Sequence, residues 1–127
     1  MTEYEKLDKI IKRFWKSKGN SDLYYLGRCA DVSYALQKYL GAGEIYLVGG
    51  NGKNLAWHTV LKVGDSYYDI RGKQTADQVL RHNPIALSTK AIVKAGPEEI
   101  AHIKSLLNHD FVNETISGLK KAEKEVG

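Results

Sequence analysis

The sequence contains very little cysteine, and this scarcity limits the chemistry open to it. Cys29 is the single cysteine among 127 residues, so no disulfide can form within the chain and a zinc site built from several cysteines is excluded. Such cysteine usage is typical of a reducing compartment, and we expect a cytoplasmic protein. Any thiol chemistry of this protein must therefore belong to one residue.

Long apolar runs are also missing. No stretch approaches the ~20 consecutive apolar residues that a membrane-spanning helix requires, so a membrane is not expected as a partner. Residues 1–19 carry charges throughout, and we expect no signal peptide there. No internal repeat, low-complexity stretch or flexible linker divides the sequence, which predicts a single domain over residues 1–127.

A strong excess of one charge is absent as well. Lysine and arginine total 19 against 15 acidic residues, and the small basic excess is spread along the chain. A nucleic-acid partner would rest on this charge alone, because no motif of a nucleic-acid-binding module is present, and we do not expect one. Apolar residues make up 43% of the chain, which is typical of a folded domain rather than a disordered one.

Apolar residues recur at helical spacing in two segments near the start of the sequence. The first helix is predicted over 3–18, where Thr2 and Glu5 fit a capping box. The second is predicted over 29–40, where a glycine follows the last turn. The two residues before this second helix offer no side-chain cap. Cys29 is thus predicted at the open N-terminus of a helix.

The pattern then changes to a period of two, which indicates β-strands. Strands are predicted over 45–48, 56–63, 66–70, 85–87 and 91–93, with Gly64 and Asp65 forming a type II′ turn between the second and the third. Further helices are predicted over 76–81, with Thr75 and Gln78 as its cap, over 97–108 and over 111–124. Helices at both ends around clustered antiparallel strands predict an α+β fold.

Three residues in this framework support a chemical hypothesis: Cys29, His58 and Asp69. Unpaired N–H groups and the positive dipole end of a helix N-terminus stabilise a thiolate over a thiol. The same N–H groups can hold the oxyanion that forms when the thiolate attacks a carbonyl. Arg28 is a candidate for additional positive charge at this site.

The predicted hairpin brings His58 and Asp69 together if its turn has two residues. In that register Val60 faces Asp69, and His58 projects from the same face as Asp69. A change of one residue in the turn would put the two side chains on opposite faces. With the pair in place, Asp69 accepts a ring N–H of His58, and the other ring nitrogen can deprotonate Cys29. The opposite face is predicted to be the core face and carries Trp57, Thr59, Leu61, Tyr68 and Ile70.

Residues 27–72 resemble the core of the papain-like and transglutaminase-like cysteine hydrolase superfamily. The segment GRCADVSYAL at 27–36 is similar to the nucleophile helix of that family, G-x-C-x-D-x-[SA]-x-x-L. WHTV at 57–60 resembles the family's histidine strand, and GDSYYD at 64–69 resembles its hairpin that ends in an aromatic residue and Asp. The order Cys, His, Asp is also the order of the family.

The resemblance implies a papain-like α+β domain, in which N-terminal helices pack on a small antiparallel sheet and further helices follow. It implies Cys29 as the nucleophile, His58 as the base and Asp69 as the residue that orients the base. The reaction expected is attack on an amide or thioester carbonyl of a peptide or protein. Proteolysis, deamidation and transglutaminase-like acyl transfer share this machinery, and the sequence leaves all three open.

Neither a metal nor a cofactor is expected, and the oligomeric state is left open. The histidines other than His58 have no accompanying carboxylate pattern and are predicted at the surface; they are His82, His102 and His109. Peptidases of the family place a glutamine a few residues before the cysteine as an oxyanion donor, and this sequence has none there. Asn20 and the hydroxyl of a tyrosine in the same stretch, Tyr24 or Tyr25, are alternative candidate substitutes. Trp57 is a candidate for contact with the substrate.

A second hypothesis belongs to another class of protein. The chain could keep the papain-like scaffold without turnover and act as a bacterial or phage protein that binds, or inhibits, a protein of its host. Cys29 would then be a small buried hydrophobic residue, as free cysteines often are. The partner expected is a protein or peptide under either hypothesis.

Overall fold

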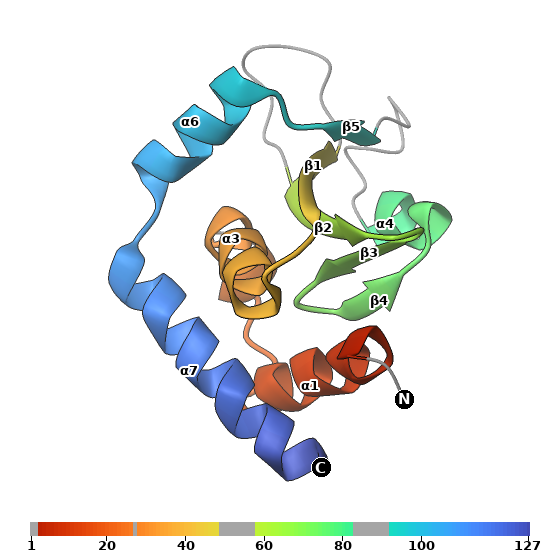
Figure 1. Cartoon of the computed structure of the whole chain (residues 1–127), viewed down its shortest axis with the longest axis vertical. Helices are drawn as coiled ribbons and strands as arrows, with labels where there is room; N and C mark the ends of the chain where they lie inside the picture. The colour runs from red at the N-terminus through yellow and green to blue at the C-terminus, as the bar shows by residue number, and fades with distance from the viewer. Residues whose placement is uncertain (1–2, 27, 49–57, 83–91) are drawn as a thin grey trace.

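The computed structural model describes residues 3–26, 28–48, 58–82 and 92–127. The helices are α1 (Glu3–Ser17), α2 (Leu23–Leu26), α3 (Cys29–Leu40), α4 (Ala76–His82), α6 (Pro97–Leu106) and α7 (His109–Val126). The strands are β1 (Glu44–Val48), β2 (His58–Val63), β3 (Ser66–Asp69), β4 (Gly72–Gln74) and β5 (Ile92–Lys94). Because the helices lie beside one antiparallel sheet (Figure 1), the α+β class predicted from the sequence is confirmed.

The sheet has the strand order β4-β3-β2-β1-β5, and every neighbouring pair is antiparallel. β2 and β3 form the predicted hairpin, with Val63 opposite Ser66. Gly64 has a φ of +59° at the turn, whereas the φ of Asp65 is not positive, and this combination fits a type II′ turn. The predicted register is therefore confirmed, and it places His58 on the same face as the side chain of Asp69.

Helices cover both faces of the sheet. On one face α3 lies between the sheet and α7 (Figure 1), and α1 packs against α7 and β4. The main hydrophobic core lies on this face and includes Phe14 and Leu61. On the other face α4 packs against β3 and β4, and its Val79 forms a smaller cluster with Val48 and Val60. β2 is thus buried from both sides, which suits a strand that holds a reactive group in place.

Local sequence features explain where the helices begin and end. Gly41 ends α3 in the left-handed conformation, with a φ of +72°. Thr75 and Gln78 form the predicted capping box of α4, since each side chain accepts from the other residue's N–H, at 3.2 Å and 2.9 Å. Asn108 caps α7 by accepting the Phe111 N–H at 3.1 Å. The predicted helices over 3–18, 29–40, 76–81, 97–108 and 111–124 are confirmed, with small shifts at their ends.

The core face predicted for the hairpin is also confirmed, because its described members are all buried: Thr59, Leu61, Tyr68 and Ile70. The strand predicted over 91–93 corresponds to β5, whereas β4 has no counterpart in the prediction. Trp57, Thr2 with its capping role, and the strand predicted over 85–87 lie outside the described residues. In the part of the chain that is described, no helix is both long and apolar enough to cross a membrane.

Candidate active site

Cys29 occupies the first position of α3, where the sequence analysis placed it. The N-cap residue, Arg28, makes no side-chain hydrogen bond to the backbone N–H groups at the start of α3, so the N–H groups of the first turn have no side-chain cap. The thiol is half-buried and forms hydrogen bonds with the His58 side chain and with the N–H and hydroxyl groups of Thr59. The sulfur atom therefore lies at the junction between the start of α3 and the start of β2.

These contacts change the protonation of the thiol. Burial acts to raise the pKa of Cys29, because it disfavours the charged thiolate. The hydrogen bond and positive charge of His58, together with the two hydrogen bonds from Thr59, outweigh burial and hold the pKa of Cys29 below its ordinary value. A lowered thiol pKa is what a nucleophilic cysteine requires, since the thiolate is the reactive form.

His58 is held from its other side by Asp69. The distance from His58 Nε2 to Asp69 Oδ2 is 2.8 Å, and both residues are buried. Because Nε2 is used in this bond, Nδ1 is the ring nitrogen that remains for Cys29. Burial acts to lower the pKa of His58, but the hydrogen bonds and negative charges of Asp69 and Cys29 raise it to about 9. The site can thus hold an imidazolium next to a thiolate.

The carboxylate of Asp69 is fixed by further donors. Its Oδ1 accepts the backbone N–H of Arg71 at 2.8 Å and the side-chain amide of Gln74 at 2.7 Å. The Arg71 guanidinium lies 3.7 Å from Oδ2. With Oδ1 occupied by two donors, Oδ2 is the oxygen directed at His58, which fixes the plane of the carboxylate.

A buried pair of hydroxyl groups, on Ser33 and Thr59, contributes to the hydrogen bonding of the Cys29 thiol. Ser33 Oγ donates to Thr59 Oγ1 at 3.0 Å, and the two residues are 0% and 3% exposed. Since the Thr59 oxygen accepts from Ser33, the hydroxyl proton of Thr59 is available for Cys29. Sequence reasoning missed this contribution, because Thr59 was assigned only to the core face of the hairpin.

The other predicted site residues have different surroundings. The Arg28 guanidinium pairs with Asp31 at 3.3 Å and lies 5.8 Å from the centre of the Phe111 ring, so its charge is directed toward a carboxylate and an aromatic face. Asn20 is exposed and adopts a left-handed conformation, with a φ of +52°, in the turn that ends α1. Trp57 lies outside the described residues.

Among the remaining histidines, His102 and His109 are exposed, as predicted. His82 is also exposed, but its Nδ1 lies 2.7 Å from Gln74 Oε1 and so connects to the site. Sequence reasoning missed Gln74 because it did not predict β4. Once β4 is paired with β3, Gln74 lies opposite Tyr67, and the alternation of side chains puts it on the face of Asp69. In the described segments, no group of three or more acidic, histidine or cysteine side chains could hold a metal ion.

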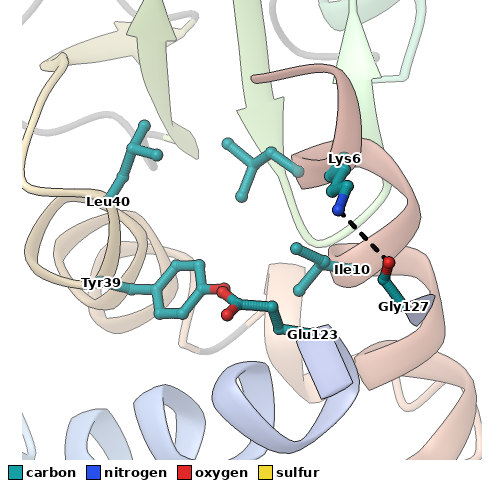
Figure 2. A pocket seen from close by; sticks show the side chains of 7 residues that line it. Lys6, Ile10, Tyr39, Leu40, Glu123 and Gly127 are labelled. Atoms are coloured by element: carbon teal, nitrogen blue, oxygen red, sulfur yellow. Dashed lines mark hydrogen bonds between the residues drawn. The ribbon is translucent and has the colours of Figure 1, made fainter. Parts of the chain in front are cut away.

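A separate pocket of about 320 Å³ lies far from Cys29, between α1, the end of α3 and the end of α7 (Figure 2). Tyr39 and Leu40 line it from the last turn of α3, whereas Cys29 begins that helix. At about 1.5 Å per residue, the two sites are separated by roughly 15 Å along α3. The Lys6 ammonium also donates to the Gly127 carbonyl at this pocket, at 3.3 Å. This pocket is therefore not part of the candidate active site.

Comparisons of the chain with protein-family models, with curated proteins and with solved structures found no match. Functional inference therefore depends on the geometry of the site itself. That geometry is a thiol at a helix N-terminus, an imidazole beside it and a buried carboxylate on the far side of the imidazole. Such an arrangement can activate a thiol as a nucleophile and return a proton to a leaving group.

Proposed function

We propose that this protein is a cysteine hydrolase or acyltransferase with a papain-like or transglutaminase-like fold, acting on amide bonds of a peptide or protein. The observation that carries the proposal is the continuous chain from Cys29 to His58 to Asp69. A cysteine that merely fills a core has no need of a histidine whose orientation is fixed by a buried carboxylate. The proposed triad also comes from three different elements, α3, β2 and β3, so its assembly is a property of the fold.

In the first half of the reaction, the Cys29 thiolate attacks the carbonyl carbon of the amide. A C–S bond forms while the carbonyl electron pair moves to oxygen, and the N–H groups at the start of α3 hold this oxyanion. His58 then gives the proton on Nδ1 to the leaving nitrogen as the C–N bond breaks. An amine or ammonia departs, and the acyl group remains on Cys29 as a thioester.

In the second half, His58 acts as a base. It takes a proton from water or from an acceptor amine, which attacks the thioester carbonyl as the C–S bond breaks and the thiolate is restored. Water yields hydrolysis of a peptide bond or deamidation of a glutamine side chain, and an amine yields acyl transfer. Asp69 keeps the ring in the orientation that serves both halves.

The proposal is tested with a small activated ester, p-nitrophenyl acetate, by following nitrophenolate release and by locating the acetyl group with mass spectrometry. Wild-type protein is expected to become acetylated at Cys29 and then to release acetate over repeated turnovers. His58→Ala is expected to lower the acetylation rate by about 100-fold or more, because general acid–base catalysis contributes roughly 10²–10⁴. His102→Ala, at an exposed histidine on α6, serves as the matched control and should leave the rate unchanged.

Two results would contradict the proposal. One is that Cys29 is acetylated no faster in the wild-type protein than in the His58→Ala variant. The other is a stable acetyl-Cys29 that neither water nor added amine removes. Either result would favour the alternative class, a binding protein that retains the scaffold without turnover.

A further inference from the structure

We propose that Gln74 and His82 are positioning residues for the triad, an inference that rests on the proposed function. They extend the hydrogen-bonded chain beyond Asp69, from β3 through the edge strand β4 to the helix α4. Their hydrogen bonds lead to Asp69, and their role is to hold the carboxylate that holds His58.

The orientation of the Gln74 amide is dictated by its neighbours. An ionised carboxylate only accepts hydrogen bonds, so the Gln74 nitrogen must face Asp69 Oδ1, at 2.7 Å. The amide oxygen then faces His82 Nδ1, also at 2.7 Å. His82 must therefore carry a proton on Nδ1, which it can do both as a neutral ring and as an imidazolium. The chain of donors consequently survives titration of His82.

The role of this chain is geometric. A side-chain amide does not accept and release protons in the way that an imidazole does, so Gln74 cannot relay a proton between the two histidines. It can hold Oδ1 of Asp69 in place, and this leaves Oδ2 directed at His58 Nε2. The other donor to Oδ1 is the Arg71 backbone N–H, so Gln74 supplies the side-chain hydrogen bond to this oxygen.

The surrounding elements keep Gln74 and His82 in place. Gln74 is 4% exposed and lies opposite Tyr67 in the β3–β4 ladder. The capping box that begins α4 follows it directly, and Val79, which is fully buried, anchors that helix to the sheet. His82 lies at the end of α4. One short strand thus brings Gln74 to the Asp69 carboxylate, and one short helix brings His82 to Gln74.

The charged groups around this chain also influence the protonation of its two histidines. Asp69 and Cys29 act on His58. Arg71, Arg81, Asp69 and His58 act on His82. The partial burial of the His82 ring around its contact with Gln74, and then the positive charge of Arg71, hold the pKa of His82 below its ordinary value. A change in the pKa of His58 is therefore a sensitive measure of how well Asp69 is held.

The test uses three variants. One at Gln74 and one at His82 each remove a hydrogen bond of the chain, and a second variant at His82 keeps a hydrogen-bond donor. Gln74→Leu removes the side-chain donor to Asp69 Oδ1, and His82→Phe removes the hydrogen bond from His82 to the Gln74 amide oxygen. His82→Asn is the matched control, because the asparagine nitrogen occupies the position of Nδ1–H. Two quantities are measured: the pKa of His58 by NMR of its ring nitrogens, and the rate of Cys29 alkylation by iodoacetamide as a function of pH.

Gln74→Leu is expected to lower the pKa of His58 and to decrease Cys29 alkylation at pH 6.5 by about three- to tenfold, since one pKa unit corresponds to a tenfold change in the ionised fraction. His82→Phe is expected to give a smaller change in the same direction, and His82→Asn is expected to behave as wild type. His82 is exposed, so its variants report even if Gln74→Leu proves unstable.

The inference is overturned if Gln74→Leu unfolds at the wild-type denaturant concentration and keeps the wild-type pKa of His58. It is equally overturned if His82→Phe and His82→Asn are indistinguishable. Failure of the proposed function gives a different result, in which the pKa of His58 still responds to Gln74 but wild-type protein does not turn over the ester. In that case the positioning of Asp69 stands and the catalytic assignment falls.

Discussion

The Cys29 sulfur atom has hydrogen-bond partners on two consecutive residues of β2, and each partner favours the thiolate. His58 supplies a hydrogen bond and a positive charge, and Thr59 supplies its N–H and its hydroxyl. Ser33 fixes the direction of that hydroxyl by donating to the Thr59 oxygen. The reactivity proposed for Cys29 thus depends on a small set of donors rather than on the helix N-terminus alone.

Thr59→Val tests the hydroxyl of Thr59, since the substitution removes the donor and keeps the shape of the side chain. We expect the pKa of Cys29 to rise, by less than in His58→Ala, because the backbone N–H and the His58 contact remain. The pKa of Cys29 is measured by the ultraviolet absorbance of the thiolate. An unchanged titration of Cys29 in the folded variant would show that the hydroxyl does not act on the sulfur.

The control for Thr59→Val is the double variant with Ser33→Ala. Thr59→Val alone leaves the Ser33 hydroxyl buried without its acceptor, which is expected to cost about 1–3 kcal/mol in the free energy of unfolding. Removing both hydroxyls should recover part of that stability without restoring the low pKa of Cys29. The two effects can therefore be separated by comparing urea unfolding with thiol titration.

At the residue scale, the sequence predicted the contact between His58 and Asp69 and missed the donors around it. The contact follows from alternation along β2 and β3 and from the length of one turn, which are local properties. The contact between Thr59 and Cys29 depends on where α3 sits against β2, and this is a tertiary property. His82 was predicted as a surface residue and is exposed, but its bond to Gln74 could not be predicted without β4.

At the scale of the elements, α1 and α7 approach each other closely where Gly118 of α7 meets the Phe14 ring of α1. A Cβ atom at Gly118 would overlap the ring of Phe14, which is 1% exposed and lies in the main core. Glycine is a poor residue for the interior of a helix, costing about 1 kcal/mol relative to alanine. Its presence in α7 is explained by the space that the Phe14 ring requires.

Gly118→Ala is therefore expected to destabilise the protein despite the better helix propensity of alanine. Overpacking of this kind costs about 1–3 kcal/mol, measured as the free energy of unfolding in urea. Ser117→Ala, at the neighbouring exposed position, is the matched control and should be neutral or slightly stabilising. If Gly118→Ala is instead as stable as the Ser117→Ala control, the close packing of α1 against α7 is contradicted.

The elements that the sequence predicted are those with periodicity and caps of their own. β4 lacks both, because its three residues carry no alternation of apolar side chains. Its geometry comes from Gly72, whose φ is +97°, and from α1, where Asp8 accepts the Lys73 N–H at 2.7 Å. An edge strand whose position depends on a helix far away in the sequence has no recognisable pattern in its own residues.

The whole molecule brings the proposed triad together from elements that lie apart in the sequence. α3 contributes Cys29, the β2–β3 hairpin contributes His58 and Asp69, and α4 supports Asp69 through β4. The α+β class could be predicted from the order of the elements. The strand order and the faces that the helices cover could not, because these depend on contacts between distant segments.

The central claim is that the folded molecule creates a thiolate–imidazolium pair between Cys29 and His58, and the pH dependence of Cys29 alkylation by iodoacetamide tests it most directly. The pKa of Cys29 is lowered, and the pKa of His58 is raised to about 9. The thiolate–imidazolium pair therefore exists at pH values between the pKa of Cys29 and the pKa of His58. Wild-type protein in buffer is therefore expected to react well below pH 8. The same protein unfolded in urea, and the folded His58→Ala variant, should react only as the pH approaches about 8.5, the ordinary pKa of a free cysteine. A native Cys29 that stays inert until pH 8–9, with the same profile in the wild type and in His58→Ala, would contradict the account.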